Sequence, residues 1–306
     1  MRFGVHSGVH NTTTGELRAL WERIEGHGFD WISIWDHFYA ADATITADGV
    51  SSGSNCLEAV TAHTALVMST SRVRCGSLVY CVSYRHPAVL ANAMATLDHF
   101  AGGRVTFGLG AGWHQGEYSA YGIPFPPASV RLRQVNEAIQ CIRLLLTEDV
   151  ADFAGEFFTL TDARCDPKPV QDRLPLWVGG GGEQVTLRIV AQHADGWNVP
   201  FVTPEQYGHK VEVLHRHCEK AGRDPAEIEC TVNLALAWRE EDLEAQFGGL
   251  ANMVRPTVLN GSVQQVVDRI GEYADAGCDQ VNVAMRAPFD VEGLDRFAAE
   301  VLPAFA

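Results

Sequence analysis

The sequence has no long hydrophobic run, no paired-cysteine motif and no excess of positive charge. No stretch approaches the roughly 18 apolar residues of a membrane span, and the first residues already resemble a strand, so we expect neither a membrane anchor nor an export signal. The eight cysteines are scattered without a C-x-x-C pair, which predicts reduced, mostly buried thiols in a cytoplasmic protein. The formal net charge of −15 disfavours nucleic acid and anionic membranes as partners.

Compact catalytic motifs are missing as well. There is no H-E-x-x-H spacing and no G-x-S-x-G elbow, so we predict neither a metal site nor acyl transfer. A dinucleotide fingerprint would need G-x-G-x-x-G. Glycines stand instead at Gly108, Gly110 and Gly112, so the third comes one residue too early, and Trp113 takes its expected place. This spacing argues against a Rossmann site.

The chain does contain a regular alternation of apolar, β-branched runs with segments of helical period. With 306 residues and 46% apolar content, eight such units predict an α/β protein with a (β/α)₈ barrel, as one domain over residues 1–306. A doubly wound sheet is the structural alternative. A small hairpin insertion is predicted around 150–170, turning at Gly155. The predicted strands are 3–7, 31–35, 73–79, 104–110, 175–179, 195–199, 229–236 and 280–284, and the predicted helices are 16–27, 57–69, 88–101, 130–147, 183–193, 204–221, 240–253 with 263–275, and 291–302.

Barrels hold their catalytic residues on the loops that leave the C-terminal ends of the strands. At Gly110 and Gly112 no side chain covers one face of the backbone, so a flat ligand could approach it there. Glycines 179–182 precede a helix whose first turn offers free N–H groups. With Glu183 and the Thr186 hydroxyl they predict a phosphate cradle, although a flexible turn capped by Glu183 would have the same sequence.

Asp36 and His37 leave the second predicted strand together. Histidine gains and loses a proton near neutral pH, so a histidine beside a carboxylate at this position could act as general acid, general base or hydrogen-bond donor. A helix cap or a surface contact is the alternative interpretation of the pair.

Several motifs, taken together and in order, resemble the bacterial luciferase-like oxidoreductases. They are W-D-H-F, S-Y-R-H-P-A-V-L-A, G-G-R-V-T-F-G-L-G-A-G-W-H-x-x-E, Y-G-I-P-F-P-P, P-K-P-V, L-W-V-G-G-G-G and A-D-G-W-N. The resemblance runs from about residue 1 to residue 200, with a weaker match through 261–303. Within the family the chain is most similar to the branch that uses the deazaflavin coenzyme F420 rather than FMN.

The resemblance implies a role for each matching position. Asp36 and His37 would lie beside the ring of the cofactor, with His37 as proton donor and Asp36 fixing its orientation. A non-prolyl cis peptide would fall at Ser77–Leu78 and contact the ring. The remaining implied residues are Gly110, Gly112, His114, Glu117, Gly180, Gly181, Gly182, Glu183 and Thr186 for the cofactor, and His6, Tyr80, Trp113 and Asn198 for the substrate pocket.

Departures from the family pattern narrow the substrate. The F420-dependent sugar-phosphate dehydrogenases that the chain resembles have an acid and a tryptophan where this sequence has Trp113 and Ala41, which puts sugar-phosphate oxidation in doubt. Aromatic Trp35, Phe38, Tyr80 and Trp113 favour an apolar or planar substrate if they point inward, and core packing is the alternative. Counter-charges for the anionic coenzyme are sought among Arg85, Lys168 and Arg188.

The resemblance therefore implies an oxidoreductase that transfers a hydride between coenzyme F420 and a small organic substrate. Two alternatives stay open. One is an FMN-dependent monooxygenase that uses reduced flavin and O2, and the other is a non-catalytic flavin-binding protein. Because relatives are often dimers, we also expect a homodimer.

Overall fold

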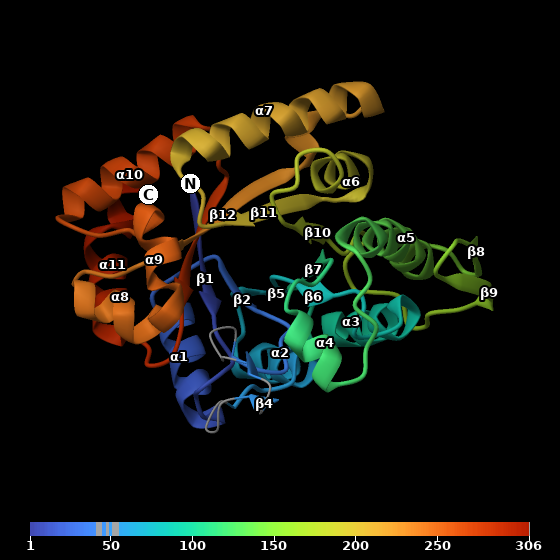
Figure 1. Ribbon diagram of the computed structural model, residues 1–306, viewed down its shortest axis with the longest axis horizontal. Helices are drawn as coiled ribbons and strands as arrows, with labels where there is room; N and C mark the ends of the chain where they lie inside the picture. The colour runs from blue at the N-terminus through green and yellow to red at the C-terminus, as the bar shows by residue number, and fades with distance from the viewer. Residues whose placement is uncertain (41–44, 47–48, 51–54, 306) are drawn as a thin grey trace.

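Eight parallel strands of the computed structural model close into a barrel (Figure 1). The structure describes residues 1–40, 45–46, 49–50 and 55–305. The strand that begins the chain pairs with the second and the last barrel strands, and a pairing between the fourth and fifth closes the ring. The predicted barrel is confirmed, and the doubly wound alternative is wrong because an open sheet would leave two edges unpaired. The barrel strands are β1 (Arg2–Ser7), β2 (Trp31–Ile34), β5 (Arg74–Ser77), β7 (Val105–Gly110), β10 (Leu176–Gly179), β11 (Gly196–Pro200), β12 (Glu229–Ala235) and β13 (Gln280–Met285).

Helices cover the outside of the barrel, and their first turns follow capping rules. Thr13, Thr203 and Ser262 each form a capping box with the Glu or Gln three residues later, which satisfies N–H groups that a helix start leaves free. The long helices are α1 (Thr14–Gly26), α2 (Ala59–Ser69), α3 (Pro87–Ala101), α5 (Ala128–Thr147), α6 (Thr186–His193), α7 (Pro204–Ala221), α10 (Val263–Asp275) and α11 (Val291–Glu300).

Several short elements depart from the sequence prediction. The predicted helix 240–253 is interrupted at Gly248, whose φ of 49° a helix does not accommodate. The helix predicted from 183 begins only at Thr186, after a turn. The additional elements are β3 (Ile45–Thr46), β4 (Gly49–Val50), β6 (Tyr80–Cys81), α4 (Gln115–Ala120), α8 (Glu240–Phe247), α9 (Ala251–Val254), and the 3₁₀ turns η1 (Pro225–Glu227), η2 (Gly248–Leu250), η3 (Arg255–Thr257) and η4 (Leu302–Phe305).

The predicted hairpin insertion is confirmed. Strands β8 (Ala151–Ala154) and β9 (Thr159–Ala163) pair antiparallel and extend beyond α5 at the edge of the molecule (Figure 1). The turn begins at Gly155, whose N–H donates to the carbonyl of Phe158. The Glu137 carboxylate of α5 accepts from the backbone N–H groups of the turn, which fixes the hairpin to the helix.

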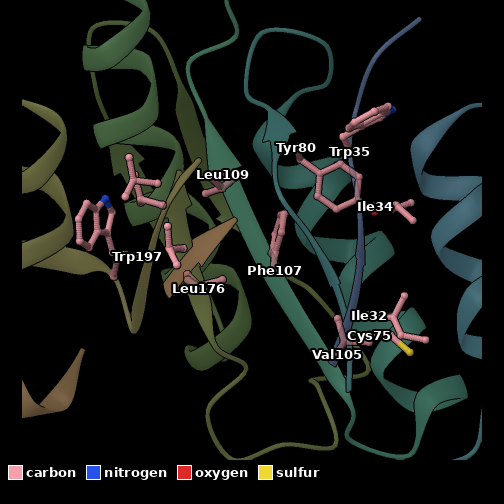
Figure 2. Close-up of a cluster of buried hydrophobic side chains, with 14 of the residues drawn as sticks. Ile32, Ile34, Trp35, Cys75, Tyr80, Val105, Phe107, Leu109, Leu176 and Trp197 are labelled. Atoms are coloured by element: carbon pink, nitrogen blue, oxygen red, sulfur yellow. The ribbon is translucent and has the colours of Figure 1, made fainter. Parts of the chain in front are cut away.

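The core divides into two parts. Outward-facing strand residues such as Ile32, Phe107 and Leu176 pack beneath the helices (Figure 2). Inside the barrel, Trp31 of β2 and Trp177 of β10 approach to 4.8 Å between ring centroids. Because two other strands separate β2 from β10, rings that touch must meet across the interior. The tryptophans therefore fill the barrel interior between these strands.

Two further expectations concern the whole chain. All eight cysteines are free, and all but Cys56 are buried, as predicted. None of the helices in the described part of the chain has both the length and the apolar character to cross a membrane.

The two ends of the chain lie side by side (Figure 1). The rings of Phe3, near the start, and Phe305, near the end, are 5.3 Å apart.

Candidate active site

A buried carboxylate forms the centre of the site at the C-terminal mouth of the barrel. Glu117 lies in the first turn of α4 and is 0% exposed. It accepts hydrogen bonds from the backbone N–H groups of Phe38 (2.8 Å) and Tyr39 (3.0 Å), the Tyr84 hydroxyl (2.7 Å) and Nδ1 of His37 (2.9 Å). Burial alone would raise the pKa of Glu117, but the hydrogen bonds from His37, Tyr84 and Tyr39 outweigh burial and lower it. Glu117 is therefore an ionised, fully coordinated group.

The Glu117 carboxylate determines which nitrogen of His37 is reactive. An ionised carboxylate only accepts, so Nδ1 of His37 must carry its proton. Nε2 has no hydrogen-bond partner among the described residues, so it is the nitrogen that can exchange a proton with a ligand. The His37 side chain is 14% exposed, which leaves it accessible from the mouth.

Asp36 does not orient His37 as predicted. Its carboxylate accepts a bidentate pair of bonds from Arg85, at 2.7 and 3.1 Å, and a third from the backbone N–H of Cys81. Burial raises the pKa of Asp36, and the Arg85 guanidinium opposes that shift. Arg85 also contacts Glu58, the N-cap of α2. Asp36 and Arg85 thus hold the end of β2 against β6 and the start of α2, while Glu117 holds the histidine.

The predicted cis peptide lies one residue later than expected, at Leu78–Val79. Its neighbours explain the glycines of β7. A Cβ on Gly108 would lie 2.1 Å from the Ser77 carbonyl oxygen, and one on Gly110 would lie 2.3 Å from a Val79 methyl group. The glycines thus make room for this bulge in the chain.

At Gly110 the face on which a Cβ would lie, expected to be open, is therefore filled by the protein itself, and contact of a ligand with Gly110 and Gly112 stays a prediction. At Gly112, with φ of 71°, the Tyr118 hydroxyl and the Cys81 sulfur occupy the space of a Cβ. Ser77 is likewise occupied, because its hydroxyl both donates to the Gly108 carbonyl and accepts from the Gly108 N–H. A ligand at this wall would meet the side chains of the bulge.

The glycine loop after β10 is open by comparison. The N–H groups of Gly181 and Gly182 have no acceptor among the described residues. Thr186 begins α6 with its hydroxyl beside Gly182, since a Cβ on Gly182 would lie 2.7 Å from that oxygen. Gly180, with φ of 122°, reaches back to β11 through its N–H. These donors have the chemistry of a phosphate cradle.

The charged groups of this loop differ from the predicted set. Lys210 of α7 donates to the Gly181 carbonyl at 2.9 Å and to the Glu183 carboxylate at 3.1 Å. The hydrogen bond from Lys210 lowers the pKa of Glu183, so the Glu183 side chain is ionised and would repel a phosphate. Among the predicted counter-charges, Lys168 instead caps α5 by donating to the carbonyls of Leu145 and Glu148. Arg188 lies in α6 and forms no ion pair with a described residue.

The predicted pocket residues separate into two groups. Trp113 and His114 lie beside His37, with ring centroids 5.6 and 6.3 Å away, and Nδ1 of His114 is buried without a described hydrogen-bond partner. His6 is held by Ser33, and burial lowers its pKa to about 3, with further lowering from the charges of Arg286 and His37, so His6 is neutral.

Tyr80 and Asn198 differ from the prediction. Tyr80 is fully buried in the core, and its hydroxyl bonds to Nδ1 of His63, so it does not line the pocket (Figure 2). The Asn198 amide donates within the barrel wall to Thr231 and Asn233. Ala41, which replaces a family tryptophan, lies outside the described residues.

Sequence reasoning missed Tyr84 and Lys210. Tyr84 lies just before the start of α3, and no local pattern marks its hydroxyl as a donor to Glu117. Lys210 lies on α7, far from the glycine loop in sequence, so only the packing of α6 against α7 brings the two together.

Comparison with known proteins gives one family for the chain. A family model described as luciferase-like monooxygenase matches residues 1–248. The F420-dependent glucose-6-phosphate dehydrogenase of Kineococcus radiotolerans is 29% identical over 256 residues, which cover 80% of this chain and 70% of that protein. The FMNH2-dependent dimethylsulfone monooxygenase of Pseudomonas putida is 27% identical over 211 residues, 68% of this chain and 57% of that one. Uncharacterized mycobacterial relatives are 34% identical over 157 residues, so the match spans about half of their length, 54%.

Solved structures agree on the fold. An F420-dependent secondary alcohol dehydrogenase in complex with an F420–acetone adduct superposes with a TM-score of 0.86 at 20% identity, covering 100% of this chain and 99% of that one. At this level of identity the likeness concerns the barrel architecture.

Proposed function

The chain belongs to the luciferase-like monooxygenase family, and we propose that it is a coenzyme F420-dependent oxidoreductase acting on a small, apolar or planar organic substrate. The observation that carries the proposal is the His37–Glu117 pair at the barrel mouth. When bound, the deazaflavin supplies or accepts a hydride equivalent, and the protein must handle the accompanying proton.

The geometry of His37 suits this task in both directions. With Nδ1 committed to Glu117, the neutral imidazole has a free lone pair on Nε2 and can take a proton from a substrate that is being oxidised. The imidazolium can return that proton to a substrate that is being reduced. The four hydrogen-bond donors around the Glu117 carboxylate keep it from rotating, and the carboxylate in turn fixes the orientation of the imidazole.

The residues present fit the coenzyme. The N–H groups of Gly181 and Gly182 and the Thr186 hydroxyl would hold a phosphate, and Lys210 would supply a positive charge beside them. His114, with its unpartnered Nδ1, and the Leu78–Val79 bulge would line the ring end of the site. Glu183, in contrast, would act through its backbone only.

We also propose that the protein works as a cytoplasmic homodimer. Met68 of α2 and Val89 and Phe100 of α3 are 64%, 65% and 63% exposed, so these neighbouring helices present apolar side chains to solvent. A second copy of the chain would cover them. Light scattering of the Phe100→Glu variant should give the monomer mass, and a dimer mass would contradict the assignment of this face.

Equilibrium titration with F420 and with FMN, followed by fluorescence at two salt concentrations, tests the proposed cofactor. We expect tight and salt-sensitive binding of F420, because the coenzyme tail is polyanionic. Preferential binding of FMN would overturn the proposal in favour of an oxygen-dependent monooxygenase, the activity named for the Pseudomonas putida relative. F420 binding without turnover of any acceptor would indicate a binding protein.

A further inference from the structure

The rim of the mouth beside His37 is built from aromatic side chains. Trp113 is 60% exposed, and its ring lies nearly perpendicular to the His37 imidazole, at 73° and 5.6 Å. Tyr121 is 56% exposed and stacks on Phe38 at 4.1 Å with only 10° between the rings. Trp113 and Tyr121 therefore present two large aromatic surfaces to solvent close to the reactive imidazole, where a ligand could cover them.

The two carboxylates nearest to His37 are buried, and both oxygens of each already accept hydrogen bonds from the protein. Both oxygens of Asp36 accept from Arg85, and one also accepts from Cys81. Both oxygens of Glu117 are occupied by backbone, tyrosine and histidine donors. A sugar recognised through its hydroxyl groups would therefore find neither carboxylate available, whereas a flat ring would find a ready surface.

We propose that Trp113 determines substrate specificity by stacking on the ring of a flat, conjugated carbonyl compound, whose carbonyl oxygen accepts a hydrogen bond from Nε2 of the His37 imidazolium. This proposal rests on the proposed function and names its substrate class. Trp113 is the residue of choice over Tyr121, because the Tyr121 ring already stacks on Phe38 while Trp113 meets its described neighbours only edge to face.

The proposed reaction is the reduction of an α,β-unsaturated carbonyl compound. The β-carbon gains the hydride, with its electron pair, that reduced deazaflavin gives up. The π pair of the α,β double bond would form a new double bond between the α-carbon and the carbonyl carbon. The π pair of the carbonyl group would move to the oxygen, which would take the proton from Nε2 of His37. The enol then isomerises as one proton moves from oxygen to the α-carbon through solvent, which gives the saturated carbonyl compound. His37 recovers its proton from water.

Binding of small probes to the protein loaded with oxidised F420 tests the proposal without turnover. Calorimetry is run with trans-cinnamaldehyde, with its saturated analogue 3-phenylpropanal and with glucose 6-phosphate. We expect the unsaturated aldehyde to bind more tightly than the other two. Trp113→Ala should weaken its binding about tenfold, Trp113→Phe should restore most of the affinity, and none of these variants should change the Kd of F420.

Val170→Ala provides the matched control. Val170 is also exposed, at 50%, but lies in the loop before β10, near Gly103 and away from the mouth. The Val170→Ala variant should bind every probe with the affinity of the wild type. Unchanged affinity of Trp113→Ala for cinnamaldehyde, or tighter binding of glucose 6-phosphate than of the flat probe, would overturn the proposal.

The two proposals fail separately. If the wild type does not bind F420, the proposed cofactor is wrong, and the same probes titrated against the FMN-loaded protein still report whether Trp113 contacts a flat substrate. If F420 binds and the probes do not distinguish Trp113→Ala from the wild type, only the substrate class is wrong.

Discussion

The two glycine-rich segments of the barrel mouth, residues 108–112 and 180–182, look alike in sequence and serve opposite purposes. At Gly108, Gly110 and Gly112 a Cβ would lie within 2.3 Å of an atom of the protein itself. At Gly180 the nearest atom is a Thr186 methyl at 3.6 Å, and Gly181 and Gly182 present N–H groups with no described acceptor. Glycine at the end of a barrel strand thus indicates that another group comes close to the backbone there. That group can be another part of the protein, as at residues 108–112, or a ligand, as we propose for residues 180–182.

The difference divides the work of the site. The first segment accommodates the Leu78–Val79 bulge and leads into α4, so it positions Glu117 and, through it, His37. The second segment forms an open loop before α6 and has donors to offer. Substitutions in the first segment, or of the Glu117 that it positions, should therefore alter stability or the rate of hydride transfer. Substitutions in the second segment should alter the affinity for the cofactor.

The largest effect is expected from Gly108→Ala. The added methyl group would lie 2.1 Å from the Ser77 carbonyl oxygen, a backbone atom that cannot rotate away. We expect the free energy of unfolding to fall by about 3 kcal/mol, the upper end of the usual cost of overpacking. Urea denaturation followed by circular dichroism measures the change.

Gly271→Ala is the control for this measurement. Gly271 lies within α10 with nothing within 4 Å of the added methyl group, so the same substitution should stabilise the protein by about 0.5–1 kcal/mol. Equal midpoints for the two variants would show that the first segment is not packed as described.

The next effect is on the chemistry. Glu117→Gln keeps the size of the side chain but removes the negative charge that commits Nδ1 of His37 as a hydrogen-bond donor. We expect the rate of hydride transfer to fall by about 10–100-fold, while the Kd of F420 changes little. Stopped-flow absorbance measures the rate, and nitrogen-15 NMR of the imidazole, which needs no substrate, should show the proton on Nδ1 in the wild type only.

Glu156→Gln makes the same chemical change on the exposed hairpin turn. It should alter neither the rate of hydride transfer nor the nitrogen-15 NMR signals of the imidazole. If Glu117→Gln keeps the wild-type tautomer and rate, the carboxylate does not position the histidine.

Much of this arrangement could be predicted from the sequence, because it depends on local patterns. All eight barrel strands fall within about two residues of their predicted ranges, and the hairpin turns at Gly155 as its sequence indicates. Asp36 and His37 are adjacent in the chain, so their place at the end of β2 followed from the strand itself. Glu117 and Trp113 were also predicted to lie near the pocket.

The partners of these residues could not be predicted, because they are set by contacts distant in sequence. The His37–Glu117 bond joins residues 80 positions apart, and Arg85 reaches Asp36 across 49. Adjacency made Asp36 the expected partner of His37, but the segment before α3 brings Arg85 to Asp36, and α4 brings Glu117 to His37. The glycines of β7 misled for the same reason, since Ser77 and Val79, at the end of β5 and in the link to β6, fill the space beside Gly108 and Gly110.

A glycine-to-alanine substitution should have a different effect in the second segment, residues 180–182, than in the first. Gly182→Ala places a methyl group 2.7 Å from the Thr186 hydroxyl, whereas the nearest backbone atom is 3.9 Å away, at ordinary contact distance. We expect a loss of stability below about 1 kcal/mol and a roughly tenfold weaker Kd for F420, because the methyl group crowds the N–H groups that would hold a phosphate. Fluorescence titration measures the affinity. A loss of stability as large as that of Gly108→Ala, with unchanged affinity, would erase the distinction between the segments.

The smallest effect is expected from Lys210→Met, which removes the cation at the second segment. The Lys210 ammonium group already donates to Gly181 and Glu183, so part of its charge is compensated, and its net attraction for an anionic coenzyme is modest. We expect the affinity of the variant for F420 to be about threefold lower than that of the wild type at low salt. At about 1 M salt the two affinities should be closer, because the Debye length there is only about 3 Å. Lys220→Met, at the exposed end of α7, changes the net charge equally and should leave the affinity unaltered. If both variants lose the same affinity, the coenzyme responds to the overall charge of the protein, and the open glycine loop holds no phosphate of its own.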